Sequence, residues 1–331
     1  MNYKKIVVAG GGILGSQIAF QTAYSEFDVT ILVKDEDSKN EVEEKLKKLK
    51  STYLDAIKEM SKEEPLEWCR GICSNKEKFS KEECIDKVNK ALESIIIESN
   101  QAKALEDADL LIESITEIID VKKSFYEQIK ELLPEKTVIV TNSSTLLPSK
   151  LAKSTGRENK FLALHFANSI WKNNIAEVMG HDKTDEKYFN EIISFAEAIN
   201  MIPLAAREEK SGYLLNSMLV PFLLSAMDLL ANGVSDAITI DKAWTLGTGA
   251  PKGPFQIIDT VGLETAKNIV LQYQKVPNIF DPLLKKMMLP YNFDGMLDIL
   301  NKYIDEGKMG KSTGEGFYKY NEEEEEIIWK R

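Results

Sequence analysis

The chain has 331 residues, and its 43% hydrophobic and 29% charged content is that of an ordinary globular protein. At roughly 150 residues per domain, this length predicts two domains. The formal net charge of −11 argues against a nucleic-acid binder, because such proteins usually carry a basic face. The longest apolar stretch, 212–231, contains Asn216, Pro221 and Asp228, so it predicts a buried helix rather than a membrane span.

Three cysteines, Cys69, Cys73 and Cys84, lie close together in the sequence. An odd number of cysteines and the lack of a recognisable signal peptide favour a reducing compartment, and we expect a cytoplasmic protein. The cysteine spacing does not match that of zinc ribbons, and no histidine lies near these thiols. The sequence therefore predicts no metal site.

The first chemical motif is a glycine run between two predicted strands. Residues 5–9 form an apolar strand, a helical stretch follows to about Ser25, and residues 28–33 form the next strand. In this context a G-x-G-x-x-G pattern is typical of dinucleotide binding. The first glycine permits the tight turn, the second lets backbone approach a pyrophosphate, the third allows close helix–strand packing, and amides at the helix start hold the phosphates. The predicted cofactor-binding residues here are Gly10, Gly11, Gly12, Ile13, Leu14 and Gly15.

The residues after the second strand bear on the choice between NAD and NADP. Asp35 is placed to bind the ribose hydroxyls, which favours NAD. Lys34 would instead contact a 2′-phosphate, which favours NADP. We expect NAD, with Asp35 as its ribose ligand.

Residues 38–60 predict a charged helix with an apolar seam at heptad spacing. The seam residues are Val42, Leu46, Leu49, Tyr53, Ala56 and Met60. We expect this helix to be one arm of a helical hairpin, packed on a second helix near residues 80–92. Ser51 and Lys58 lie on its other face and are candidates to meet a ligand.

Strands then alternate with helices, which predicts an α/β fold with a doubly wound sheet of the Rossmann type. The further strands are expected at 94–98, 109–113, 137–141, 161–166 and 175–179, with a helix at 120–133. Ligands of such sheets bind beyond the carboxyl ends of the strands. Residues 142–144 and His165 follow or end two of these strands, so we expect them to face the same crevice as the glycine turn.

The pattern changes near residue 206, after which long apolar helical stretches dominate. They are expected at 212–231, 239–246, 262–273 and 293–305. The sequence therefore predicts a dinucleotide-binding domain over 1–206, with the helical-hairpin arm, and an all-α C-terminal substrate and dimerisation domain over 207–331. The acidic run Glu322–Glu326 is expected to be a solvated tail.

A hydroxyl, an imidazole and a carboxylate lie at the ends of predicted strands: Ser144, His165 and Glu177. Oxidation of a secondary alcohol needs a base for the hydroxyl proton while the hydride leaves for nicotinamide. Histidine suits this role, because its unperturbed pKa is about 6.5. A carboxylate on the other ring nitrogen would fix the tautomer and stabilise the imidazolium.

Together with further motifs, these residues show that the sequence resembles the 3-hydroxyacyl-CoA dehydrogenase family over nearly its full length. The family's N-S/T-S-S-L turn is similar to residues 142–146, its H-F-F-N-P segment to 165–169, and its L-V-E-V strand to 175–178. The family's P-G-F-x-x-N-R linker is similar to residues 211–217, and its G-x-G-x-P-x-G-P-F motif to 247–255, which 259–263 follow. Its C-terminal K-T-G-x-G-F-Y-x-Y signature is similar to residues 312–320.

The resemblance implies a role for each matching residue. His165 is the base, Glu177 its paired carboxylate, and Ser144 and Asn216 hold the substrate oxygen. The implied cofactor contacts are Glu117, Lys122, Asn142 and Asn168. Ser144, Ser51 and Lys58 are the implied acyl-CoA contacts. The resemblance also implies a homodimer.

Several positions depart from the family pattern. They are Ala167, Ser169, Ser211, Ser217 and Ser312, with Lys311 next to the last of these. None removes a catalytic group, so the reaction is better defined than the substrate.

Three functions remain open. The first is NAD-dependent oxidation of a short-chain 3-hydroxyacyl-CoA. The second is the same chemistry on a free hydroxy acid, as in gulonate and carnitine dehydrogenases, and residues 146–150 resemble the gulonate branch. The third is a non-catalytic dinucleotide-binding protein, which would not need the acid–base pair.

Overall fold

The computed structural model describes residues 3–274 and 291–320. The chain divides into two compact units, Met1–Leu214 and Leu215–Arg331. This division falls after the boundary expected at residue 206, because Tyr213 and Leu214 still bond to residues of the first unit. The acidic run Glu322–Glu326 lies outside the described residues.

The first unit is built on an eight-stranded sheet with the order β3-β2-β1-β4-β5-β6-β7-β8. The strands are β1 (Lys5–Ala9), β2 (Asp28–Leu32), β3 (Ile96–Glu98), β4 (Leu110–Glu113), β5 (Val138–Thr141), β6 (Phe161–Phe166), β7 (Ile175–Met179) and β8 (Ile202–Ala206). Neighbouring strands are parallel except for β6 and β7, which are antiparallel. Strand β8 was not expected from the sequence.

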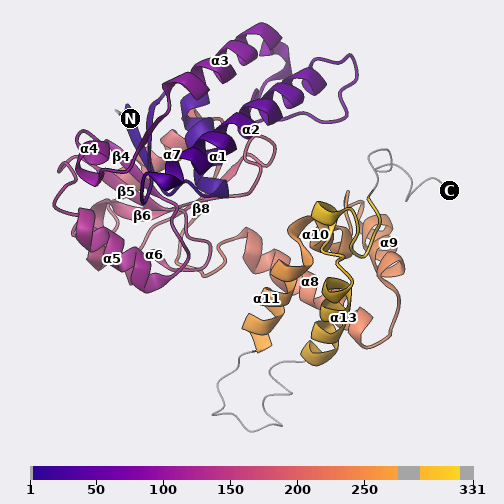
Figure 1. The fold of residues 1–331 in the computed structure, drawn as a ribbon. Coiled ribbons are helices and arrows are strands. Elements are labelled where there is room, and N and C mark those ends of the chain that lie inside the picture. The colour runs from indigo at the N-terminus through magenta and orange to yellow at the C-terminus, as the bar shows by residue number, and fades with distance from the viewer. Residues whose placement is uncertain (1–2, 275–290, 321–331) are drawn as a thin grey trace. The chain divides into compact units, whose positions relative to one another are not determined.

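Helices cover both faces of this sheet, as expected for a doubly wound fold (Figure 1). They are α1 (Ile13–Tyr24), α2 (Asp37–Met60), α3 (Lys81–Ser94), α4 (Gln101–Leu105), α5 (Ile119–Ile129), α6 (Pro148–Leu151) and α7 (Glu186–Ala198), with short 3-10 turns at Lys76–Lys78, Ala152–Thr155 and Glu158–Lys160. Alternate residues of β1 belong to different clusters, Ile6 and Val8 on one face and Val7 and Ala9 on the other. The first face packs on α1, α2, α3 and α7, and the second on α4, α5 and α6.

The helical-hairpin arm is present as α2 and α3, which pack on each other (Figure 1). Its buried seam on α2 is Val42, Leu46, Leu49, Tyr53, Ile57 and Met60. Of the expected seam residues, Ala56 is partly buried against the same cluster, and Ile57, which was not expected, is fully buried at this turn. An α-helix has 3.6 residues per turn rather than the heptad's 3.5, so the buried stripe drifts along a long helix.

The second unit is helical. Its described helices are α8 (Leu215–Ala231), α9 (Ala237–Thr248), α10 (Pro254–Val261), α11 (Leu263–Gln274) and α13 (Phe293–Asp305), with a 3-10 turn at Lys311–Thr313. Phe255, Leu263, Met296 and Leu300 are fully buried within its own apolar cluster. Within the described ranges, no helix combines the length and the apolar character that crossing a bilayer requires.

Candidate active site

His165 and Glu177 lie opposite each other on β6 and β7. The antiparallel register pairs the two residues directly, and Nδ1 of His165 is 2.9 Å from Oε2 of Glu177. Glu177 is 1% exposed and His165 is 9% exposed. The second carboxylate oxygen, Oε1, accepts a 2.8 Å hydrogen bond from the backbone amide of Leu214. The carboxylate is therefore held at both oxygens.

The expectation that Glu177 ends a strand was wrong, because it lies in the middle of β7. The loop between β6 and β7 covers only residues 167–174, whereas a parallel crossover needs a dozen residues or more. The chain therefore turns back, and β7 runs antiparallel to β6. This reversal brings the imidazole and the carboxylate together across two strands.

The contact with Glu177 determines which nitrogen of the His165 imidazole can accept a proton. An ionised carboxylate only accepts hydrogen bonds, so the proton on Nδ1 of His165 points to Glu177. The lone pair of neutral His165 then lies on Nε2. An imidazole in this tautomer can take a proton from a substrate at Nε2 while the carboxylate stabilises the resulting cation.

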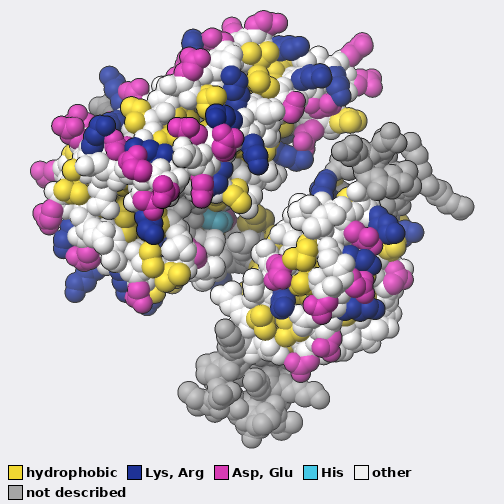
Figure 2. Space-filling model, in the orientation of Figure 1, with side chains coloured by type: hydrophobic (Ala, Val, Ile, Leu, Met, Phe, Trp, Pro, Cys, Tyr) yellow, Lys and Arg dark blue, Asp and Glu magenta, His cyan; other side chains and the backbone are white. Residues whose placement is uncertain are grey.

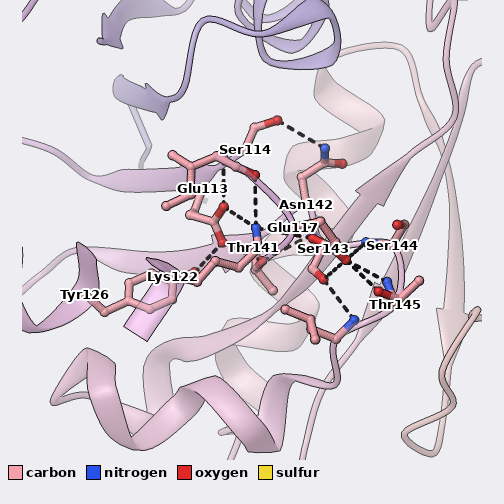
Figure 3. Close-up of polar contacts among 12 residues, drawn as sticks. Glu113, Ser114, Glu117, Lys122, Tyr126, Thr141, Asn142, Ser143, Ser144 and Thr145 are labelled. Carbon is pink, nitrogen blue, oxygen red and sulfur yellow. Dashed lines mark hydrogen bonds and ion pairs between the residues drawn. The ribbon is translucent and has the colours of Figure 1, made fainter. Parts of the chain in front are cut away.

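Glu117 organises the turn that carries Ser144. Its Oε1 accepts hydrogen bonds from the hydroxyl of Ser143 (2.5 Å), the amides of Ser144 (3.0 Å) and Thr145 (2.9 Å), and the hydroxyl of Thr145 (2.9 Å). Figure 3 shows these bonds converging on one carboxylate. Burial raises the pKa of Glu117, but the bonds from Ser143 and Thr145 outweigh it and lower the pKa below its ordinary value. The hydroxyl of Ser144 has no hydrogen-bond partner within the described part of the chain, which leaves it available to a substrate.

Glu113, a fully buried carboxylate at the end of β4, holds the residues beside this turn. It accepts bonds from Lys122 Nζ (2.5 Å), Tyr126 Oη (2.8 Å) and Thr141 Oγ1 (2.8 Å) (Figure 3). Lys122 is 1% exposed and also lies 3.5 Å from Glu117. Glu117 and Lys122 are therefore bound within the protein and hold the Ser144 turn, a geometry that the sequence did not predict.

Asn142 connects three strand ends. Its amide nitrogen donates to Ser114 Oγ (3.2 Å), and its Oδ1 accepts from the backbone amide of Phe166 (3.0 Å), next to His165. Asn168 is exposed, and its carbonyl accepts a bond from Asn173. The structure thus brings Asn142 to the edge of the sheet where Ser114 and His165 lie, with both ends of its side chain already engaged.

The glycine turn forms one wall of a cavity of about 920 Å³ at this same edge. Its lining includes residues 10–12, 32–34 and 114–116 and parts of α2 and α5. Gly10 has φ 108°, and a Cβ there would lie 2.5 Å from the carbonyl oxygen of Ser114, while a Cβ on Gly15 would lie 2.0 Å from that of Gly10. A Cβ on Gly12 would meet no protein atom within 4 Å, so this backbone is open to a ligand. The geometry and the cavity volume fit a dinucleotide with its phosphates at the start of α1.

The structure places Asp35 differently from the expectation. Its Oδ1 accepts two bonds from Ser38, at the backbone amide (3.0 Å) and the hydroxyl (2.6 Å), near the start of α2. Lys34 and Ser38 line the cavity, whereas Asp35 does not. Of Lys34 and Asp35, the lysine is therefore the residue that forms part of the cavity wall.

Lys45 also lines this cavity and was missed by the sequence analysis. Its Nζ donates a 3.1 Å bond to the carbonyl of Gly11 and lies 3.6 Å from Glu41. The spacing in the sequence could have indicated this position. Lys45 is one helical turn from the seam residue Val42, and the Val42 side chain packs against the glycine turn.

Ser51 and Lys58 are exposed and lie seven residues apart on α2, hence on the same side of that helix about 10 Å apart. Asn216 is the second residue of α8, in the second unit. No site holding three or more candidate metal ligands occurs among the described residues.

Two further residues beside His165 were missed. Tyr213 stacks on its ring, and Leu214 donates to Glu177. Both belong to the segment 211–217, which resembles the family's P-G-F-x-x-N-R motif.

Hydride exchange with a bound nicotinamide is the chemistry that such an imidazole–carboxylate pair beside a dinucleotide cavity serves. The fold and the site therefore define the class of NAD-dependent dehydrogenases. Residues 5–209 match the NAD-binding domain of 3-hydroxyacyl-CoA dehydrogenase, and residues 212–320 match its C-terminal domain. The chain belongs to the 3-hydroxyacyl-CoA dehydrogenase family, and its cofactor is NAD.

Relatives match between two thirds and nearly all of the chain. It is 31% identical to the human mitochondrial hydroxyacyl-coenzyme A dehydrogenase over 96% of this chain and 91% of the relative. A 3-hydroxybutyryl-CoA dehydrogenase of Clostridioides difficile is 29% identical over 66% of this chain and 73% of its own. A solved diketoreductase, described by its substrate-directed dual catalysis of dicarbonyl compounds, is 42% identical over 97% of this chain and 100% of its own, with a TM-score of 0.80.

Proposed function

We propose that this dehydrogenase interconverts the 3-hydroxyl and 3-oxo groups of a short-chain 3-hydroxyacyl-CoA. The observation that carries the proposal is the 2.9 Å contact between His165 and the buried carboxylate of Glu177 at the edge of the sheet where the Ser144 turn and the glycine turn lie. The family match and the relatives that act on hydroxyacyl-CoA and 3-hydroxybutyryl-CoA support the substrate class.

In the oxidation, Nε2 of His165 takes the hydroxyl proton, and Glu177 stabilises the imidazolium through Nδ1. The hydroxyl of Ser144 donates to the substrate oxygen and fixes its direction relative to His165. The alcohol thus loses one proton to His165 and one hydride from C3, and a ketone remains. When bound, NAD supplies the nicotinamide ring that accepts this hydride. The reduction runs through the same groups in reverse.

The remaining roles follow the same proposal. Asn216, at the start of α8, adds a second contact to the substrate oxygen. Ser51 and Lys58, on the exposed side of α2, contact the coenzyme A portion, with the ammonium group of Lys58 matching its phosphates. Residues 10–15 hold the pyrophosphate. Asn168, exposed beyond β6, is a cofactor contact. Glu117, Lys122 and Asn142 act indirectly, because they hold the turn that lies next to the bound cofactor.

A second candidate substrate is a small free keto or hydroxy compound without coenzyme A. The observation in its favour is the 42% identity, over 97% of this chain, to a diketoreductase that acts on dicarbonyl compounds. The same His165, Glu177 and Ser144 set serves this reaction, since a free diketone presents a carbonyl like that of a 3-oxoacyl thioester.

One parallel assay decides between the two substrates. NADH oxidation is followed with acetoacetyl-CoA, with free acetoacetate and with a free diketone. A kcat/KM for acetoacetyl-CoA well above both others supports the first candidate, and the reverse ranking supports the second. His165→Ala is the control, because it should remove turnover with every substrate while NAD binding survives; near-normal turnover in this variant would contradict the assignment.

We also propose a homodimer formed through the second unit. Apolar side chains are exposed there around a hollow of about 450 Å³, lined by Phe222, Leu229, Val234 and Trp244 among others. Exposed apolar patches of this kind mark protein contacts. Leu246, on the same helix as Trp244, and Leu66, on the first unit, are both largely exposed. Leu246→Asp should shift the mass in light scattering to that of a monomer, whereas Leu66→Asp should not. An unchanged dimer in Leu246→Asp, or a monomeric wild type, contradicts this proposal.

A cytoplasmic location is the corresponding proposal for the compartment. It is supported by the cysteines Cys69, Cys73 and Cys84, all of which are free thiols. Cell fractionation tests it, and recovery with an organelle or an envelope fraction would contradict it.

A further inference from the structure

Tyr213 lies directly against the imidazole of His165. The two ring centroids are 4.8 Å apart and the ring planes are inclined by only 23°, so the rings are stacked. Tyr213 is 1% exposed. Its ring covers one face of the imidazole and limits rotation of that ring about the bond to its backbone.

The hydroxyl of Tyr213 reaches the Ser144 turn. It donates a 2.7 Å hydrogen bond to the carbonyl of Ser143, the residue just before Ser144. One side chain thus contacts both the base and the backbone that presents the substrate-holding hydroxyl. The family's P-G-F motif has phenylalanine at the position of Tyr213, so the hydrogen bond from the tyrosine hydroxyl is a feature of this chain.

Ser211 and Leu214, close to Tyr213 in the chain, also bond to the Ser144 turn and to the partner of His165. The hydroxyl of Ser211 donates to the carbonyl of Thr145 (2.9 Å), and the amide of Leu214 donates to Oε1 of Glu177 (2.8 Å). Gly212 has φ 83° and Tyr213 has φ 51°, in the left-handed region that non-glycine residues rarely adopt. Such a conformation persists where surrounding contacts hold it, and it is what turns the Tyr213 ring onto His165.

We propose that Tyr213 is a positioning residue that holds the ring of His165 and the Ser143–Ser144 backbone in one geometry. The proposal deepens the proposed function, on which it rests. A tyrosine that merely filled space would need neither a ring parallel to the imidazole nor a hydroxyl bonded to this particular carbonyl. Tyr213 sets the distance and angle between base and substrate oxygen, to which proton transfer is sensitive.

Two substitutions separate the two contacts. Tyr213→Phe keeps the stacked ring and loses the bond to Ser143, and kcat should fall about threefold to tenfold, the range for one lost hydrogen bond. Tyr213→Leu loses both contacts, and kcat should fall about a hundredfold or more through misplacement of the base. KM for the substrate and Kd for NAD should stay within about twofold in both variants, because neither contact touches the cofactor cavity.

The matched control is Tyr3→Phe. The hydroxyl of Tyr3 donates a 2.9 Å hydrogen bond to Glu191, which the variant loses. Tyr3 precedes β1 and therefore lies at the amino ends of the parallel strands, away from His165. Its kcat should equal that of the wild type. If Tyr213→Leu does not fold, the comparison of Tyr213→Phe with Tyr3→Phe still decides, and equal kcat values in these two variants overturn the role of the hydroxyl.

A second readout does not depend on turnover. The chain has two histidines, so the ring-proton NMR signals of His165 can be told apart from those of His181. Loss of the stacked ring in Tyr213→Leu should shift the His165 signals downfield and leave those of His181 unchanged, while Tyr213→Phe should leave both in place. The pH dependence of kcat should move in Tyr213→Leu and be restored by phenylalanine.

The outcomes are distinct. Wild-type kcat and unmoved His165 signals in Tyr213→Leu overturn the proposal, as does a loss of kcat matched by an equal loss of NAD affinity. A wild type inactive on all tested substrates contradicts the proposed function instead, and the NMR comparison still tests the stacking.

Discussion

Glu177 and His165 face each other across the antiparallel pair β6–β7, with 2.9 Å between Oε2 and Nδ1. Because β7 returns directly after an eight-residue loop, 167–174, no helix separates the two strands. The carboxylate therefore meets the imidazole from a central position of a buried strand, where its orientation is set by the sheet itself. This gives the base one defined tautomer.

Glu177→Gln should lower kcat by about 10²- to 10⁴-fold. The amide keeps the volume and can still accept the bond from Leu214, but it can no longer stabilise a positive charge on His165. Steady-state kinetics measures the loss, and calorimetric titration with NAD should show an unchanged Kd. A variant that keeps more than half of the wild-type kcat would contradict the role of Glu177.

Glu117 predicts a pH dependence of stability. Its folded-state pKa is lowered, so its contribution to stability is present above the unfolded-state value of about 4.3 and is lost as pH falls through the lower folded-state pKa. The difference in Tm between wild type and Glu117→Gln should therefore be largest near neutral pH and shrink below pH ~4. A difference that is constant from pH 7 to pH 3 argues against this charge effect.

Gly12 and Gly15 give a paired prediction for the cofactor site. Gly12→Ala adds a methyl group in open space, so Tm should match the wild type while the Kd for NAD rises, because the methyl group occupies the path of the phosphates. Gly15→Ala places a methyl group 2.0 Å from the carbonyl oxygen of Gly10, so both Tm and NAD affinity should fall. Thermal unfolding with and without NAD separates the two effects, and an unchanged Kd in Gly12→Ala would refute the placement of the phosphates.

Ser169 departs from the family's proline for a structural reason. Its φ is 58°, which proline cannot adopt, and its backbone amide donates a 2.8 Å bond to Gln17. Restoring the family residue with Ser169→Pro should reduce the free energy of unfolding by about 3 kcal/mol. Ser169→Gly, which tolerates positive φ, should be close to neutral. Denaturant unfolding of the two variants measures this, and equal stabilities would show that the loop is not held in this conformation.

The sequence alone determined the class of fold, the glycine turn and the main chemical groups. Strand and helix periodicity are local, so β1, β6 and β7 were located to the residue from the pattern. The glycine requirement at position 15 is also local, because a Cβ there would meet the carbonyl oxygen of Gly10, whereas at position 10 it also depends on the close approach of Ser114. The family motifs then identified Ser144, His165 and Glu177 as a set.

Only the tertiary structure decided how these groups meet. The pairing of His165 with Glu177 depends on strand register, and the stacking of Tyr213 on His165 joins residues nearly fifty positions apart. The turn of Asp35 toward Ser38, away from the cavity, and the reach of Lys45 to Gly11 depend on how α2 packs beside the glycine turn. Such contacts depend on the packing of distant segments, which local periodicity does not encode, and they determine the geometry on which proton and hydride transfer depend.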